Sequence, residues 1–404
     1  MQNDQVNLDL RSSVQNHLDY MISIREHIHA YPELSDEEFD TSKLVFDELT
    51  QFGVENIKMI ADTGVTGVIR GALPGPTILL RADMDALEIE EKTNVPYRST
   101  KKGIMHACGH DGHTASLLGV AKILMQNRET LKGTIVLAFQ PAEEGEGGAK
   151  RMIDEGILEN PNVDYAFAFH VSEIDEEGVV GLFAGGFQSS CDDITIEFYG
   201  VGGHGSTPHL CINPIDLGMD FLQRIRNYIA GGFHGSDNNI LSFGQFIAGH
   251  AGNIIPETAE LKGSLRTYNV DSRKLILKKI EECLQQTIAL YGGRYEIKAH
   301  PFAPVLYNNP QLIEKSASLL QKYFDPKLLT YLDKPAIGSE DFAFFSEKVP
   351  SVYYTVGICK GKKISLHSPD FEWRSHVLQY SCWSMLCLAY YLNEYVHAPL
   401  AGEA

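Results

Sequence analysis

The stretch Thr77-Ile-Leu-Leu-Arg-Ala-Asp83-Met-Asp85 places two carboxylates directly after a short, mostly apolar run. Runs that are continuous rather than alternating are typical of strands buried on both faces of a sheet. Residues 133–139 and 165–169 form two more runs of this kind, and helical patterns lie between the runs. Because strands that alternate with helices favour helices layered on a sheet, the sequence predicts an α/β layer structure.

The other patterns in the first 190 residues fit the same architecture. Periodic apolar positions predict helices at 14–30, 36–53, 112–126 and 148–155, with a further strand at 67–70. Ser35 stands just before the second of these helices, and Glu38 follows three residues later. This is the spacing of a capping box, so we expect Ser35 to cap that helix.

A second pattern begins near residue 190. The expected elements alternate as strand, helix, strand, strand, helix and strand, at 193–198, 213–229, 239–246, 258–268, 272–290 and 294–301. This order is the ferredoxin-like arrangement, and about 110 residues is a natural size for it. The α/β pattern then resumes, with elements at 310–324, 352–356 and 377–395. We therefore predict that one domain, residues 1–190 and 303–404, is interrupted by an inserted α+β domain, residues 191–302.

The composition limits the possible functions. The chain has 404 residues, with 34 Lys and Arg against 53 Asp and Glu, giving a net charge of −19. This balance argues against nucleic-acid binding, which needs clustered Lys and Arg, and against adsorption to anionic lipid. No apolar stretch is long enough to span a membrane, and residues 1–11 lack the apolar core of a signal peptide. Seven scattered cysteines without a CxxC pair exclude a zinc ribbon and fit a reducing cytoplasm.

Metal-capable side chains follow three of the predicted strands. Asp83 and Asp85 follow the first, Glu143 and Glu144 the second, and His170 the third. In open α/β sheets, ligands bind beyond the carboxyl ends of the strands, so we expect these groups to form one site. Taken singly, each has an ordinary explanation: paired acids are common on solvated surfaces, and a lone histidine after a strand is more often structural.

A fourth cluster, His106-Ala-Cys108-Gly-His110-Asp111-Gly-His113, stands just before a predicted helix. Cysteine and histidine at positions i and i+2 of a turn, with glycine between them, can converge on one ion. Because a helix N-terminus favours negative charge, we expect it to stabilise the Cys108 thiolate even before metal binds. A polar helix cap beside a buried cysteine is the alternative interpretation.

Glu143 and Glu144 are expected to have different roles. They lie between a buried strand and the flexible Gly145 and Gly147. Neighbouring side chains of an extended segment point in different directions. One carboxylate can therefore bind metal while the other faces a reacting water as a general base.

Five motifs together resemble the binuclear metal-dependent amidohydrolases. This family includes aminoacylases, hippurate hydrolases, N-acetyldiaminopimelate deacetylases and auxin-conjugate hydrolases, within the clan of glutamate carboxypeptidase. The motifs are Arg25 to Ser35 with Pro-Glu-Leu-Ser at its end, Arg81-Ala-Asp-Met-Asp-Ala-Leu, His106-Ala-Cys-Gly-His-Asp-Gly-His, Gln140-Pro-Ala-Glu-Glu-Gly and Gly338-Ser-Glu-Asp-Phe. They occur in order over nearly the whole chain. The resemblance implies a zinc-exopeptidase-like catalytic domain, with a mixed sheet flanked by helices, and an inserted ferredoxin-like domain for closure and dimerisation.

The resemblance also implies roles for single residues. The expected ligands of two divalent metal ions are Cys108, His110, Glu144, His170 and His367, with Cys108 able to bridge the ions. Glu143 becomes the general base, and Asp85 is expected to orient a metal-binding imidazole. The ions are expected to be manganese or zinc, although cobalt and nickel also suit such ligands.

In the inserted domain, His204 resembles the residue that reaches the acyl carbonyl of the substrate. Asn253 and Arg266 resemble contacts to the substrate carboxylate, for which the planar fork of arginine is suited. The implied reaction is hydrolysis of an N-acyl-amino acid by a cytoplasmic homodimer or higher oligomer that pairs through this domain. The segment after His170, Val-Ser-Glu-Ile-Asp-Glu-Glu, departs from the family pattern, so the shape of the pocket stays open.

Three alternatives remain at this point. The same site could serve a dipeptidase or a carboxypeptidase acting on a true peptide bond. The chain could also be a metal-binding protein without catalysis, although Glu143 would then have no reason to accompany Glu144. A thiol enzyme could instead use Cys108 as its nucleophile with His110 or His106, and its activity would survive chelation.

Overall fold

The computed structural model describes residues 10–145, 147–232, 239–361, 363 and 365–392. The chain forms two compact units. The larger unit holds the described residues of 1–185, 307–335 and 341–404, and the smaller unit holds those of 186–306 and 336–340. The chain passes between the units near β7 (Gly185–Gln188) and β14 (Leu306–Asn308).

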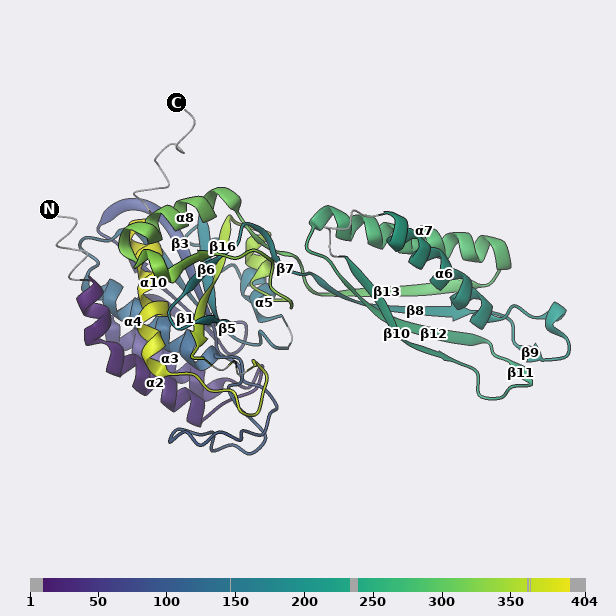
Figure 1. The fold of residues 1–404 in the computed structure, drawn as a ribbon, viewed down its shortest axis with the longest axis horizontal. Helices are drawn as coiled ribbons and strands as arrows, with labels where there is room; N and C mark the ends of the chain where they lie inside the picture. The colour runs from purple at the N-terminus through teal and green to yellow at the C-terminus, as the bar shows by residue number, and fades with distance from the viewer. Residues whose placement is uncertain (1–9, 146, 233–238, 362, 364, 393–404) are drawn as a thin grey trace, which may run out of the picture. The chain divides into compact units, whose positions relative to one another are not determined.

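An eight-stranded mixed sheet forms the centre of the larger unit (Figure 1). Its strands, in spatial order, are β1 (Glu55–Ile60), β2 (Gly64–Arg70), β4 (Lys132–Gln140), β3 (Leu73–Asp83), β5 (Tyr165–Glu176), β16 (Ser351–Cys359), β6 (Val180–Leu182) and β15 (Leu329–Tyr331). The four central strands β4, β3, β5 and β16 are parallel to one another. Their carboxyl ends therefore meet at one edge of the sheet.

Helices pack around this sheet. Their bounds are α2 (Leu18–Ala30), α3 (Phe39–Phe52), α4 (His110–Gln126), α5 (Gly148–Asp154), α8 (Pro310–Tyr323), α9 (Ala343–Ser346) and α10 (Leu378–Tyr391), and residues 10–16 are also helical. Helix α4 is buried along most of its length and contacts α2, α3 and α10. Short 3₁₀ turns lie at Pro326–Leu328 and Ser375–Val377. The mixed sheet flanked by helices confirms the predicted fold class.

The smaller unit has the ferredoxin-like order that its sequence predicts. The elements are β8 (Cys191–Tyr199), α6 (Pro214–Gly232), β10 (Ile240–Ala248), β12 (Thr258–Arg266), α7 (Val270–Tyr291) and β13 (Arg294–Ala303). The strands pair antiparallel in the order β10-β12-β8-β13 (Figure 1). Alternate residues of β8, including Ile194, Ile196 and Phe198, are buried in a core shared with both helices. A two-stranded antiparallel sheet of β9 (Gly203–His204) and β11 (Ile254–Ile255), called the β9–β11 ribbon below, and a 3₁₀ turn at Pro208–Leu210 complete the unit.

Two local predictions in the larger unit are wrong. Helix α3 begins at Phe39, and no side chain caps it; the Ser35 hydroxyl donates instead to Asp85 Oδ2 at 2.7 Å. Strand β5 does not end at Phe169 but continues to Glu176, so His170 lies within a strand rather than after one. The strand continues because β16 pairs with it in parallel beyond His170, through Val356 and Gly357.

The sequence prediction missed three strands in the outer parts of the large sheet. Strands β1 and β15 lie at its two edges, and the three-residue strand β6 lies between β16 and β15. The helix expected at 377–395 is observed as α10 up to Tyr391, and residues 393–395 lie outside the described part of the chain.

Candidate metal centre

The carboxyl ends of the parallel strands bring the predicted acidic and imidazole groups together. Asp83 is the last residue of β3 and pairs in register with Gln140, the last residue of β4. Glu143 and Glu144 follow Gln140 after Pro141 and Ala142, and His170 lies in β5 on the other side of β3. The site is therefore assembled by the sheet topology, as expected for an open α/β sheet.

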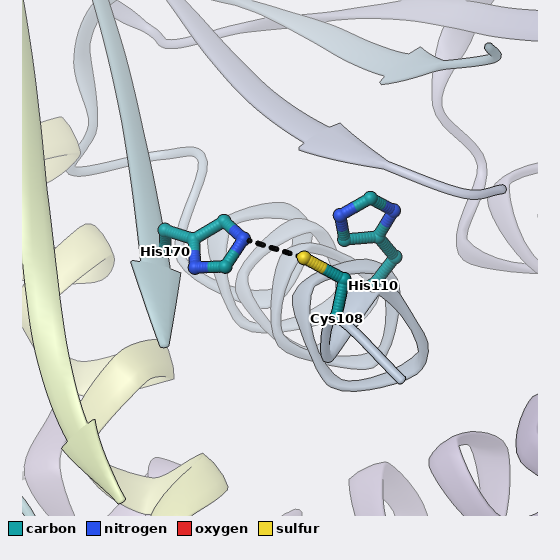
Figure 2. A group of neighbouring side chains, drawn as sticks. All are labelled: Cys108, His110 and His170. Atoms are coloured by element: carbon teal, nitrogen blue, oxygen red, sulfur yellow. Dashed lines mark hydrogen bonds between the residues drawn. The ribbon is translucent and has the colours of Figure 1, made fainter. Parts of the chain in front are cut away.

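Cys108 is the centre of this cluster. Its Sγ lies 3.3 Å from His170 Nε2 and 3.3 Å from His367 Nε2. Figure 2 shows the His170 ring turned toward the Cys108 sulfur, with His110 starting the helix beside it. His367 Nε2 also lies 3.1 Å from Glu144 Oε1. The described residues thus contain two groups of three potential donors that share Cys108: one with His110 and His170, the other with Glu144 and His367.

His110 has one engaged and one available ring nitrogen. Its Nδ1 lies 2.9 Å from the Asp85 carbonyl and 3.2 Å from Asp85 Oδ1. Its Nε2 is buried and makes no hydrogen bond within the described residues, although Glu143 Oε2 lies 4.0 Å away. Burial lowers the pKa of His110, but the carboxylates of Asp83 and Asp85 outweigh it and raise that pKa to about 10. Without metal the ring is therefore protonated, and a metal ion at Nε2 would take the place of that proton while Asp85 holds Nδ1.

The His170 ring is fixed as a neutral donor. Its Nδ1 lies 2.7 Å from the Val171 carbonyl, so Nδ1–H donates and the Nε2 lone pair faces Cys108. Burial and the neighbouring His113 hold the pKa of His170 well below its usual range. Neutral imidazole is the form that ligates metal ions.

The Cys108 thiol does not behave as the sequence predicts. Burial, together with Glu144 and Glu143, raises its pKa well above the ordinary thiol value. The expected stabilisation by the N-terminus of α4 is therefore wrong, because desolvation and two nearby acids outweigh a helix dipole. A nucleophilic cysteine needs the opposite environment, so the structure disfavours the thiol-enzyme alternative.

Two backbone features bring the donors within reach of one another. Gly109 has φ of +94°, and a Cβ there would lie 2.5 Å from a Val171 methyl group. Only glycine therefore allows the turn between Cys108 and His110 to approach β5. His367 has φ of +59°, and its N–H donates to the Ala107 carbonyl at 2.9 Å. This bond ties the last donor to the segment that carries Cys108.

Asp85 supports both His110 and the loop of the two glutamates. Besides its contact with His110, its Oδ2 accepts the Glu144 N–H at 2.9 Å and the Ser35 hydroxyl at 2.7 Å. Asp85 is completely enclosed, and its pKa stays below the usual range because His110 and these donors outweigh its burial. Asp85 therefore contacts an imidazole of the cluster, and its role in orienting a metal ligand stays a prediction.

The structure reveals supporting residues that sequence reasoning did not identify. His113 donates from Nδ1 to Asp83 Oδ1 at 2.6 Å, and its Nε2 accepts the Val171 N–H at 3.1 Å. Both ring nitrogens are therefore occupied, so His113 positions β5 and has no nitrogen left for a metal ion. The guanidinium of Arg81 in turn holds Asp83 at 2.6 Å. The burial of Arg81 within an otherwise apolar run was the available signal.

His204, Asn253 and Arg266 belong to the smaller unit. His204 is exposed on the β9–β11 ribbon, where its Nδ1 accepts the Ser206 N–H at 3.1 Å. Asn253 is its neighbour, because the Gly205 N–H donates to the Asn253 carbonyl at 2.9 Å. Arg266 ends β12, whereas the ribbon lies beyond the Thr258 end of the same strand. The strand separates the two groups by about 26 Å, at about 3.3 Å per residue.

Residues 79–388 match the model of Peptidase family M20/M25/M40. The chain belongs to this family. The match includes the strand, helix and loop segments that carry all five donors of the cluster.

Members of the M20/M25/M40 family with different names resemble this chain over most of its length. The hippurate hydrolase of Campylobacter jejuni is 38% identical over 82% of this chain and 86% of its own. The thermostable carboxypeptidase 1 of Saccharolobus solfataricus is 38% identical over 88% and 90%. The crystal structure of Bacillus subtilis YXEP, described as a dinuclear metal binding peptidase of the M20 family, matches with a TM-score of 0.80. It is 30% identical and covers 95% of this chain and 100% of its own.

Proposed function

We propose that this protein hydrolyses the amide bond of N-acyl-amino acids with two divalent metal ions, releasing a carboxylic acid and a free amino acid. The observation that carries the proposal is the cluster of donors around the buried Cys108, with Glu143 beside it. A C. jejuni relative named hippurate hydrolase, 38% identical, supports this reaction class.

The proposed ligands are Cys108, His110, Glu144, His170 and His367. Two donor groups share the Cys108 sulfur, so these five residues would hold two ions, with Cys108 available to both. Thiolate and imidazole donors suit zinc, and the carboxylate also admits manganese, with cobalt and nickel as further candidates. When bound, divalent ions supply Lewis acidity, which polarises a carbonyl and lowers the pKa of water.

Glu143 is proposed as the general base. Its carboxylate is largely buried, and its Oε2 lies 4.0 Å from His110 Nε2. It accepts a proton from the attacking water and later returns that proton to the leaving amine. Glu144 is turned toward His367 instead, which fits the expected division between a base and a ligand.

His204, Asn253 and Arg266 are proposed to bind the substrate, His204 at the acyl carbonyl and the other two at the carboxylate. Opposite ends of β12 are too far apart for His204 and Arg266 of one chain to reach the same small molecule. We therefore infer a homodimer, formed through the smaller unit, in which a second copy supplies the β9–β11 ribbon with His204. Closure of this unit over the substrate would exclude water.

The proposed location is the cytoplasm. All seven cysteines are free, which fits a reducing compartment. Among the described residues, no helix is both long enough and apolar enough to cross a membrane.

The test is amine release from a panel of N-acetyl-, N-benzoyl- and long-chain acyl-amino acids together with dipeptides. The protein is stripped with chelator and resupplied separately with manganese, zinc, cobalt or nickel. We expect cleavage of one acyl class that depends on added metal. Cleavage of dipeptides alone would instead favour a carboxypeptidase-like activity, in line with the S. solfataricus relative. Bound metal without any cleavage would leave a non-catalytic metal-binding protein.

A further inference from the structure

The turn that leads into Glu143 has an unusual backbone conformation. Ala142 has φ of +49°, in the left-handed region that residues with a Cβ rarely adopt. Such a conformation persists only where the surroundings fix it, and it occurs most often at functional sites. The loop of residues 140–145 therefore needs a partner that holds Ala142.

Glu38 is that partner. This side chain at the start of α3 is completely buried, and its Oε1 accepts the Ala142 N–H at 2.8 Å. Its Oε2 accepts the Thr63 hydroxyl at 2.6 Å. One carboxylate thus joins the helix start, the turn between β1 and β2, and the loop that carries both site glutamates.

The surroundings of Glu38 fit the loop closely. A Cβ at Gly64 would lie 2.9 Å from the Pro141 ring, so the β1–β2 turn packs directly against the loop. Thr63 is itself held, because its carbonyl accepts a hydrogen bond from the Ser42 hydroxyl. Both the Thr63 partner of Glu38 and the loop it contacts are therefore held by further contacts of their own.

We propose that Glu38 is a positioning residue that holds Ala142 in its left-handed turn and so aims the Glu143 carboxylate at the reacting water. The proposal rests on the proposed hydrolase function. Asp85 anchors the same loop two residues later, at the Glu144 N–H. Within the described residues, the hydrogen bond of Glu38 to this loop is the one at Ala142, and it makes none to the donor atoms around Cys108.

The two hydrogen bonds of the Glu38 carboxylate, to the Ala142 N–H and the Thr63 hydroxyl, are called the clamp below. The clamp depends on the length of the Glu38 side chain and not on its charge. In Glu38→Gln the amide oxygen can still accept the Ala142 N–H, and the amide nitrogen can donate to the Thr63 hydroxyl. Glu38→Asp keeps the carboxylate but is one methylene too short to span both partners. Glu38→Ala removes the clamp entirely. Val45→Ala, at another buried position of α3, is the matched control for loss of packing without loss of the clamp.

The experiment measures kcat and KM of the manganese- or zinc-loaded protein on its best substrate from the acyl-amino acid panel. We expect Glu38→Gln to keep kcat within about threefold, and Glu38→Asp and Glu38→Ala to lose about 10–100-fold in kcat with KM within about twofold, because small displacements of a reacting group carry such costs. Metal content and the activity of Val45→Ala should stay near wild type. Wild-type kcat in both Glu38→Asp and Glu38→Ala would overturn the proposal.

Hydrogen–deuterium exchange of the peptide covering 137–145, in the metal-free protein, gives a readout without activity. Faster exchange at Ala142 in Glu38→Asp, but not in Glu38→Gln, supports the clamp, and unchanged exchange in both variants overturns it. If wild type hydrolyses nothing in the panel, the proposed function fails while this measurement still decides the role of Glu38. Glu38→Asp keeps the measurement open should Glu38→Ala not fold.

Discussion

The proposed metal centre and the β9–β11 ribbon differ in how their side chains are held. Around the metal centre each donor is buried or held by a hydrogen bond: His110 by Asp85, His170 by the Val171 carbonyl and Glu144 through its own N–H. On the β9–β11 ribbon, His204 is exposed, and its hydrogen-bond partner Ser206 lies only two residues further along the chain. In the proposed reaction, the metal-binding side chains are thus held in place beforehand, whereas His204 stays accessible to a substrate.

This difference shows how the two groups are tuned. Metal ligands require exact geometry, so the larger unit surrounds them with supporting hydrogen bonds. A group that contacts the substrate after closure must stay accessible, so rigid burial would prevent its function. The comparison predicts that substitutions at the metal centre lower both kcat and the free energy of unfolding. Substitutions on the β9–β11 ribbon should lower kcat without loss of stability.

The largest expected effect is at Glu143. Glu143→Gln removes the base while keeping the size of the side chain, so kcat should fall by about 10²–10⁴-fold, the usual contribution of general base catalysis. Metal content, measured by elemental analysis, should not change. Loss of metal from this variant would show that Glu143 is a ligand and would break the division between Glu143 and Glu144.

The proposed exchange of the β9–β11 ribbon between two copies is tested by complementation. His204→Ala should lower kcat by about 10²-fold or more, as removal of an oxyanion donor does, and leave the melting temperature unchanged. A heterodimer of His204→Ala with Glu143→Gln, isolated with two affinity tags, should recover about half of the wild-type activity, because one of its two sites then carries neither lesion. A silent heterodimer would mean that each chain uses its own His204.

A pH-dependent contribution is expected from the support beneath the centre. Burial lowers the pKa of His29, but its hydrogen bonds to Asp111 and Glu91 outweigh this and raise the pKa from 6.5 to about 9. A folded-state pKa above the unfolded value stabilises the protein at low pH, so this contribution is full below pH 6.5 and is lost as the pH rises through about 9. Denaturant unfolding of wild type and His29→Asn should differ by up to about 3 kcal/mol at pH 6 and converge above pH 9. A constant difference across this range would exclude the titration of His29.

The smallest expected effect is at Ser35. Ser35→Ala removes one hydrogen bond to Asp85 but leaves those from the Glu144 N–H and His110. We expect a loss of about 1 kcal/mol in unfolding free energy and a change in kcat of only a few-fold. A loss as large as that of Glu143→Gln would show that Asp85 depends on Ser35 far more than its other contacts suggest.

The sequence was informative where topology alone decides the outcome. The parallel strands and the positions of Asp83, Glu143 and His170 near their ends are enough to predict one shared site. The partners of each donor were harder to predict, because they depend on contacts between distant segments. Glu38 looked like half of a capping box, yet its carboxylate contacts Ala142, 104 residues away in the sequence.

The separation of His204 and Arg266 was also outside the reach of pattern. The motifs around both residues are clear in the sequence, but their distance depends on which end of β12 each one occupies. The register of a strand is set by pairing with β8 and by the core beneath it, neither of which a motif contains. The proposal that a second copy completes the site rests on this register.

The raised pKa of the Cys108 thiol has a consequence for the life of the protein before metal arrives. Oxidants and alkylating agents attack thiolates, and a thiol that keeps its proton reacts slowly with them. We therefore expect the Cys108 thiol of the metal-free protein to react slowly with alkylating agents. Metal binding at this sulfur would release its proton, so the affinity for metal should rise with pH.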